Sequence, residues 1–113
     1  MAKATFVQDG GAVDYTPGSA VAAGDVVVQG ELVGVARTPI AANALGSVAV
    51  AGVFDFTKAT GGGSAITAGA NCYWDVAEQV AKTDSESGAN KLLGKCVKAA
   101  VDADATVRVR LSQ

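Results

Sequence analysis

The most constraining feature of this sequence is a strict alternation of polar and apolar residues in the run Thr106–Leu111. A period of two places successive side chains on opposite faces of an extended chain, which is typical of a half-buried β-strand. Similar short runs, rich in valine and bounded by glycine, are predicted as strands at residues 2–8, 12–16, 25–29, 32–37, 47–56, 71–74 and 79–82. The sequence therefore predicts an all-β fold, a small β-barrel or β-sandwich of short antiparallel strands with glycine-rich turns.

The length of 113 residues predicts one β domain over 1–113, with residues 1–10 as a possible N-terminal arm. The strand predicted at 2–8 precedes the turn signal Asp9-Gly10-Gly11, and its two faces would carry different side chains. Such a segment can add to the edge of a sheet outside its own body. We therefore expect an interface with a partner protein or an adjacent subunit at Lys3, Thr5, Phe6 and Val7, with Phe6 as the anchor.

Residues 89–101 are open to two interpretations. Their apolar residues fall at helical spacing, but Gly94 in the middle would cost a helix about 1 kcal/mol relative to alanine. Leu93, Lys95 and Val97 also alternate as in a strand. We favour a strand and keep the helix as the alternative.

Short patterns recur along the chain. Val21–Gly24, Ile40–Asn43 and Ile66–Gly69 each lead into a strand and end in a residue that tolerates positive φ, which predicts a repeated turn. Glu31–Gly34 is also echoed by Lys91–Gly94. The unequal spacing favours recurrent turns within one barrel or sandwich over a solenoid.

The chain contains no histidine, which removes the commonest general base and the commonest metal ligand. The loop Gly61–Ser64 lacks the lysine of a phosphate-binding loop, and the acidic segments 84–88 and 102–104 lack the spacing of a calcium loop. We interpret these segments as surface loops and solvated turns. The sequence predicts that the protein is not an enzyme and uses no cofactor or metal.

The cysteines and the aromatic pair at 72–74 have structural and functional interpretations. Cys72 and Cys96 have no partner residues for a zinc site, so we expect small buried side chains, and their pairing as a disulfide stays open. Trp74 alternates with Cys72 and is expected in the core, with Tyr73 on the other face. The alternative is a ligand- or glycan-binding module that uses Tyr73 and Trp74.

Nine basic and eleven acidic residues give a formal charge of −2, with both signs scattered along the chain. No basic stripe is apparent in the sequence, so no nucleic-acid partner is expected. No run reaches the ~18 apolar residues of a membrane span, and the first residues lack an apolar signal core. We expect a soluble protein, made in the cytoplasm, with no membrane partner.

The order of several motifs resembles a family of short proteins encoded beside the major capsid gene in tailed phages and prophages. The resemblance covers almost the whole chain and rests on residues 23–28, 32–36, 52–59, 73–75 and 105–111. Members resemble capsid cement or head decoration proteins. The family has also been labelled a predicted phage recombinase, but this sequence has neither the phosphate-loop lysine nor a basic strand-binding groove.

The resemblance implies a structural virion protein that binds the outer surface of a phage head and stabilises it. Its partners would be the major capsid protein and further copies of itself, and it would be made in the host cytoplasm. Because the core is rich in alanine and valine and poor in aromatic residues, we also expect a homo-oligomer, a trimer suited to threefold positions on the head. No catalytic residue is implied.

Overall fold

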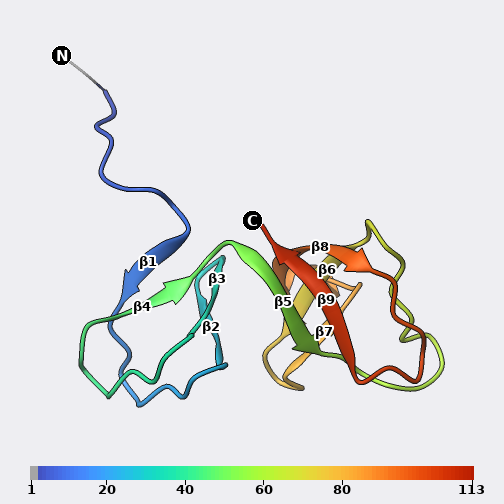
Figure 1. The fold of residues 1–113 in the computed structure, drawn as a ribbon. Coiled ribbons are helices and arrows are strands. Elements are labelled where there is room, and N and C mark those ends of the chain that lie inside the picture. Colours follow the sequence, from blue (N-terminus) through green and yellow to red (C-terminus); the bar gives the residue numbers. More distant parts are fainter. Residues whose placement is uncertain (1–2) are drawn as a thin grey trace.

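The computed structural model describes residues 3–113 and has two antiparallel sheets that lie side by side (Figure 1). The first sheet has the order β1-β4-β3-β2. Its strands are β1 (Ala12–Tyr15), β2 (Val26–Gln29), β3 (Leu32–Val35) and β4 (Gly46–Ala49). The second sheet has the order β5-β9-β8-β6-β7. Its strands are β5 (Gly52–Thr57), β6 (Asn71–Asp75), β7 (Val80–Lys82), β8 (Lys91–Lys98) and β9 (Thr106–Leu111), with the single 3-10 turn η1 (Glu86–Gly88) between β7 and β8.

The all-β prediction is confirmed. The predicted strands at 12–16, 25–29, 32–37, 71–74, 79–82 and 106–111 are β1, β2, β3, β6, β7 and β9, with ends that differ by at most two residues. A tight hairpin turn at Gly30 joins β2 to β3, and Gly30 has the positive φ of 61° that this turn requires. In the second sheet, the two edge strands approach each other and are joined by one parallel bridge between Lys58 and Ala81.

The single strand predicted at 47–56 is wrong, because the chain forms two strands there. It leaves the first sheet after Ala49 and enters the second sheet at Gly52, whose φ is +122°. A bend at Ala51 separates the two. Periodicity did not reveal this break, since valine and alanine continue through it.

The strand predicted at 2–8 is also wrong for the residues that the structure describes, whereas Met1 and Ala2 lie outside the described residues. Residues 3–9 are extended and exposed, and they project from the body of the first sheet (Figure 1). A strand needs a partner strand for its hydrogen bonds, and none lies beside this segment within the described part of the chain.

Within residues 89–101, Lys91–Lys98 form β8, so the strand interpretation is confirmed and the helix is not formed. The expected alternation is nevertheless interrupted. The register between β8 and β9 shifts between Cys96 and Lys98, and Val97 is exposed rather than buried. A bulge of this kind moves the following side chains to the opposite face of the strand.

The interior is divided into two clusters of buried side chains. The larger cluster lies mainly within the second sheet: Val33, Val35, Phe56, Ile66, Cys72, Trp74, Ala81, Leu93, Cys96, Ala100, Val107, Val109 and Leu111. The smaller cluster lies within the first sheet: Val27, Ala36, Ile40 and Val48. Valines from β2 and β3 contribute to both clusters, so this hairpin connects the two sheets.

The backbone of β9 passes close to Gly94 of β8. A β-carbon placed on this glycine would lie 2.0 Å from the carbonyl oxygen of Arg110 in β9. Gly94 also has a φ of +156° and faces Cys72 across the bulged pair β6–β8. Only glycine fits this position without separating the strands.

We predict that Gly94→Ala destabilises the protein by about 3 kcal/mol or more, because the new methyl group must displace backbone. Gly62→Ala is the matched control, since nothing lies within 4 Å of a β-carbon there. Urea unfolding followed by circular dichroism measures both. Equal unfolding midpoints for the two variants would contradict the prediction.

Candidate functional site

The predicted interface residues lie on the exposed arm. The side chain of Phe6 is 80% exposed and that of Val7 is 85% exposed, and Lys3 and Thr5 are exposed as well. The segment is held to the body near its end, where Gln8 Nε2 donates a hydrogen bond of 3.0 Å to the carbonyl of Ala12. The structure therefore brings these four residues together on one extended segment and leaves their apolar side chains in solvent.

The expected core position of Trp74 is confirmed. Its ring is 3% exposed and packs on Phe56 with centroids 6.0 Å apart, and its Nε1 has no hydrogen-bond partner within the described residues. Tyr73 is half-buried on the other face of β6. Since Trp74 offers no free face, a ligand could stack on it only if the core opened.

The two cysteines are buried free thiols, as expected for small core residues. Burial, with a further contribution from the neighbouring Cys96, raises the pKa of Cys72 to about 11. At neutral pH the Cys72 thiol is therefore protonated and a poor nucleophile.

In the glycine-rich loop and the acidic turns, backbone N–H groups donate hydrogen bonds to nearby aspartate carboxylates. The carboxylate of Asp102 accepts hydrogen bonds from the N–H groups of Ser64 (3.1 Å) and Ala65 (2.8 Å), so it fixes the end of the loop 61–64. Asp104 accepts from the N–H of Val101, and Asp84 from the N–H of Glu86. These contacts are those of turn-stabilising residues.

Lys58 is buried at the end of β5, and its ammonium group donates to the carbonyls of Ala59 (2.7 Å), Asp104 (3.1 Å) and Asp102 (3.4 Å). A buried ammonium group is stable only when its donors are satisfied, and here backbone carbonyls satisfy them. Lys58 thus ties β5 to the turn before β9.

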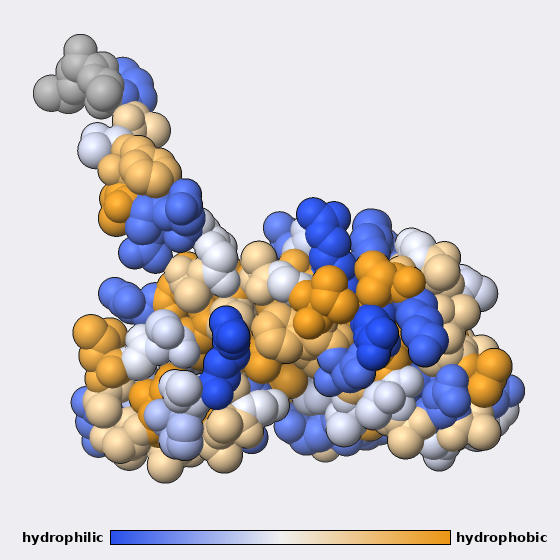
Figure 2. Space-filling view, viewed as in Figure 1, coloured by the Kyte–Doolittle hydropathy of each residue, from blue (hydrophilic) through white to orange (hydrophobic). Residues whose placement is uncertain are grey.

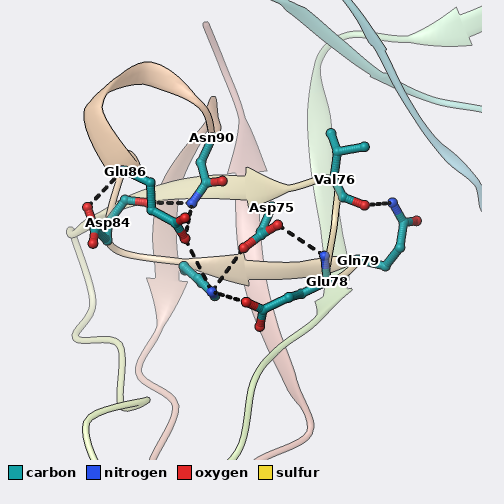
Figure 3. Close-up of polar contacts among 8 residues, drawn as sticks. Asp75, Val76, Glu78, Gln79, Asp84, Glu86 and Asn90 are labelled. Carbon is teal, nitrogen blue, oxygen red and sulfur yellow. Dashed lines mark hydrogen bonds and ion pairs between the residues drawn. The ribbon is translucent and has the colours of Figure 1, made fainter.

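A second lysine, Lys82 of β7, is surrounded by carboxylates, and Figure 3 shows the strand region in which Asp75, Glu78 and Glu86 lie. It lies 2.9 Å from Asp75, 2.9 Å from Glu78 and 3.3 Å from Glu86. The hydrogen bond from Lys82, and a second one from the N–H of Glu78, lower the pKa of Asp75 below its ordinary value. The carboxylates in turn raise the pKa of Lys82. This cluster fixes β7 and η1 to β6.

Strand pairing gathers cationic side chains on the outer face of the second sheet. Lys95 of β8 lies directly opposite Arg110 of β9, and Lys98 lies opposite Arg108. These are four of the nine basic residues, and all four are exposed. We call this surface the basic face. Like charges opposite each other on adjacent strands are unfavourable, so this arrangement lowers the stability of the free protein.

The basic face has few counter-charges. Asp55 of β5 makes a two-atom contact with Arg108, with Nε to Oδ1 at 2.9 Å and Nη2 to Oδ2 at 3.2 Å, and Arg108 lowers the pKa of Asp55. Lys95 donates to the neutral side chain of Asn71. The exposed Val53 and Val97 lie among the charges, and hydrophobic and hydrophilic surface alternate over this part of the molecule (Figure 2).

Sequence reasoning missed the basic face because its residues come from two segments that are about ten residues apart. The alternation of Arg108 and Arg110 predicted that both point outward, and Lys95 is exposed on the neighbouring strand. What the sequence did not contain was the pairing of β8 with β9, which converts scattered charges into a patch.

Residues 3–113 contain no helix long and apolar enough to cross a membrane. Within the same residues, no three cysteine or acidic side chains lie close enough together to hold a metal ion. The basic face and the arm are therefore the surfaces that stand out on the described chain.

Comparison with known proteins gives one match. A family model described as phage cement protein matches residues 7–111, which is nearly the whole chain. No curated protein and no solved structure gives a significant match.

We predict that Asp75→Asn reduces the loss of stability at low pH. Because the pKa of Asp75 is lowered in the fold, its contribution is fully present above the unfolded pKa of about 4 and is lost as the pH falls through the folded value. Urea unfolding at pH 7 and pH 3 should show a smaller difference for Asp75→Asn than for the unmodified protein. Asp14→Asn is the control, since Asp14 is exposed and forms no ion pair within residues 3–113. If both variants lost as much stability as the unmodified protein, the assignment would be wrong.

Proposed function

The chain belongs to the phage cement protein family, and we propose that it binds the outer surface of a phage capsid and stabilises the capsid there. The observation that carries the proposal is the family match, which spans both sheets. The family is one of structural phage proteins, so the protein is a virion component and its partner is the major capsid protein.

The basic face supports attachment to an acidic surface. Its four cations are held on a rigid sheet, and two pairs of like charges lie directly across from each other. An acidic partner would relieve this repulsion, and complementary charge also speeds association. We therefore propose that the basic face is turned toward the capsid.

The arm supports attachment through an added strand. An extended segment with Phe6 and Val7 in solvent gains backbone hydrogen bonds and apolar contact when it orders against a sheet edge, and these offset the conformational entropy that it loses. We propose that Lys3, Thr5, Phe6 and Val7 dock onto the capsid or an adjacent subunit, with Phe6 as the anchor. Oligomerisation, as a trimer at threefold positions, would multiply the weak contacts of each copy.

The structure offers less support for the other candidate functions. A glycan-binding module would need aromatic faces, but Trp74 is buried against Phe56. A nucleotide-dependent enzyme would need a free lysine beside the glycine-rich loop, but Lys58 is bound by carbonyl groups and Lys82 by carboxylates. We propose a purely structural, non-enzymatic role.

We predict that a protein lacking residues 2–7 stays folded and does not bind phage heads. The deleted residues contribute no strand among the described elements, so circular dichroism should be unchanged. Co-sedimentation with purified heads measures binding. A truncated protein that binds heads as well as the full chain does would show that the arm is not the attachment device.

We predict that Arg110→Glu weakens head binding several-fold without loss of folding stability. Opposite Lys95, a glutamate would replace a repulsive pair by an attractive one, worth about 0.2–1 kcal/mol. Binding should also depend less on salt, because fewer charges meet across the interface. Arg37→Glu, an equal charge change at an exposed residue in the loop after β3, is the control. If both variants bind heads equally, the basic face does not contact the capsid.

A further inference from the structure

The two sheets are built from the same unit. Six backbone hydrogen bonds outside the ladders occur in both halves at equivalent positions. The bridge between Val21 and Ile40 in the first half, for example, corresponds to the bridge between Ile66 and Ala100 in the second. Residue numbers differ by 45 before the hairpin turn, as from Val21 to Ile66, and by 60 after it.

Strand pairing follows the same correspondence. Val27 faces Gly34 in the pair β2–β3, and Cys72 faces Gly94 in the pair β6–β8. The outer strands match too, since β1 pairs with β4 as β5 pairs with β9. The chain therefore contains two copies of one four-stranded unit, in the order β1-β4-β3-β2 and β5-β9-β8-β6.

The copies differ mainly by one long insertion at the hairpin turn, and the segment from Thr57 to Ile66 is also three residues longer than the equivalent segment from Tyr15 to Val21. The turn that Gly30 makes between β2 and β3 is replaced in the second unit by residues 75–90, which contain β7 and η1. β7 pairs with the outer edge of β6, antiparallel, and touches β5 through the parallel bridge between Lys58 and Ala81. In the second unit a strand thus lies between β6 and β5.

In the first unit the equivalent position is an open groove. It lies along β2 and the end of β1 and is lined by Tyr15, residues 17–21 and residues 25–28, with Gln79 of the second unit at its border. β2 pairs only with β3, so alternate N–H and C=O groups on its other edge have no strand partner within residues 3–113.

We propose that this groove binds the arm of a second copy of the chain, residues 3–9, as an added strand that takes the place β7 takes in the second unit. The inference rests on the proposed role of the arm as a docking segment, and it identifies the adjacent subunit as the receptor. The segment to be bound is present in every copy, is already extended, and pairs with no strand among residues 3–113.

Strand direction requires that the arm come from another copy. A strand placed like β7 runs antiparallel to β2 and parallel to β1. The arm of the same chain is joined to β1 by the short turn at Asp9–Gly11, and a connection of this length can only make adjacent strands antiparallel. The arm of the same chain can therefore add to the free edge of β1 but cannot occupy the groove as β7 would.

The side chains of the arm and of β2 are also complementary in size. In the second unit the large Trp74 lies on β6 opposite the small Ala81 of β7. The first unit has the exposed Gln29 at the position of Trp74, so an aromatic ring is missing there. An arm strand with Phe6 opposite Gln29 supplies a large ring from the added strand.

An arm that enters the groove of the next copy makes a head-to-tail contact, in which two different surfaces meet. Contacts of this type close into rings when the rotation between copies allows it. The inference therefore gives a physical route to the trimer proposed above, in which each copy donates one arm and receives one.

A mixing experiment tests the exchange directly. The single variants Phe6→Cys and Gln29→Cys are purified separately, mixed and oxidised, and the native Cys72 and Cys96 are buried and do not compete. The expected product is a disulfide-linked heterodimer of twice the 11.1 kDa chain mass. In the control, Phe6→Cys is mixed with Asp14→Cys, which places the thiol on the exposed edge strand β1. Heterodimer formation with Asp14→Cys but not with Gln29→Cys would overturn the proposal.

Solution mass provides an independent test. Light scattering should give a multiple of 11.1 kDa for the full chain and the mass of a monomer after deletion of residues 2–7. The control is Val53→Ser, which changes an exposed apolar residue outside the arm and the groove and should leave the oligomer intact. An unchanged mass after the deletion, or a full chain that stays monomeric at high concentration, would refute arm exchange. Head binding is measured on the oligomer of the unmodified chain, which keeps Phe6, and the cross-link only reports that arm exchange occurs. If that oligomer forms but does not bind heads, arm exchange stands and the proposed capsid-binding function fails.

Discussion

The hairpin β2–β3 is the element on which the rest of the structure depends, because both of its faces are buried. On one face, Val27 and Ala36 pack into the smaller cluster. On the other, Val33 and Val35 belong to the larger cluster, and Val26 and Val28 pack against it. A strand buried on both faces loses the polar alternation of a half-buried one, which explains the unbroken valine run at 26–28. The same burial leaves only the edge of β2 free to make new contacts.

The elements that the sequence predicted correctly are those whose signals are local. The alternation in 106–111 depends only on neighbouring residues, and the structure contains the predicted strand there as β9. The break between β4 and β5 was not predictable from periodicity, because the residues that cross it are as apolar as those on either side. The break occurs where the chain passes from the first sheet to the second, and this depends on tertiary structure rather than on the local sequence.

The repeated unit was visible in the sequence only in part. The turn ending at Gly24 and the one ending at Gly69 were recognised as similar, as were the segments ending at Gly34 and Gly94. The first pair is 45 residues apart and the second pair 60, and this inequality argued against a repeat. The difference between 45 and 60 equals the net length of the insertion that contains β7. A duplication with an internal insertion therefore has two spacings instead of one.

The lack of a strand at residues 3–8 and the presence of the basic face were not predicted for a common reason, since both depend on pairing between strands. The segment 3–8 has the composition of a strand but no partner strand within the described residues, and the cations of β8 and β9 form a patch only in the observed register. The free backbone donors of the arm are a template for pairing with another chain, and the unbalanced charge of the basic face is unfavourable in an isolated molecule. A protein that works in a lattice of neighbours can carry such features, because each contact with a neighbour satisfies one of them.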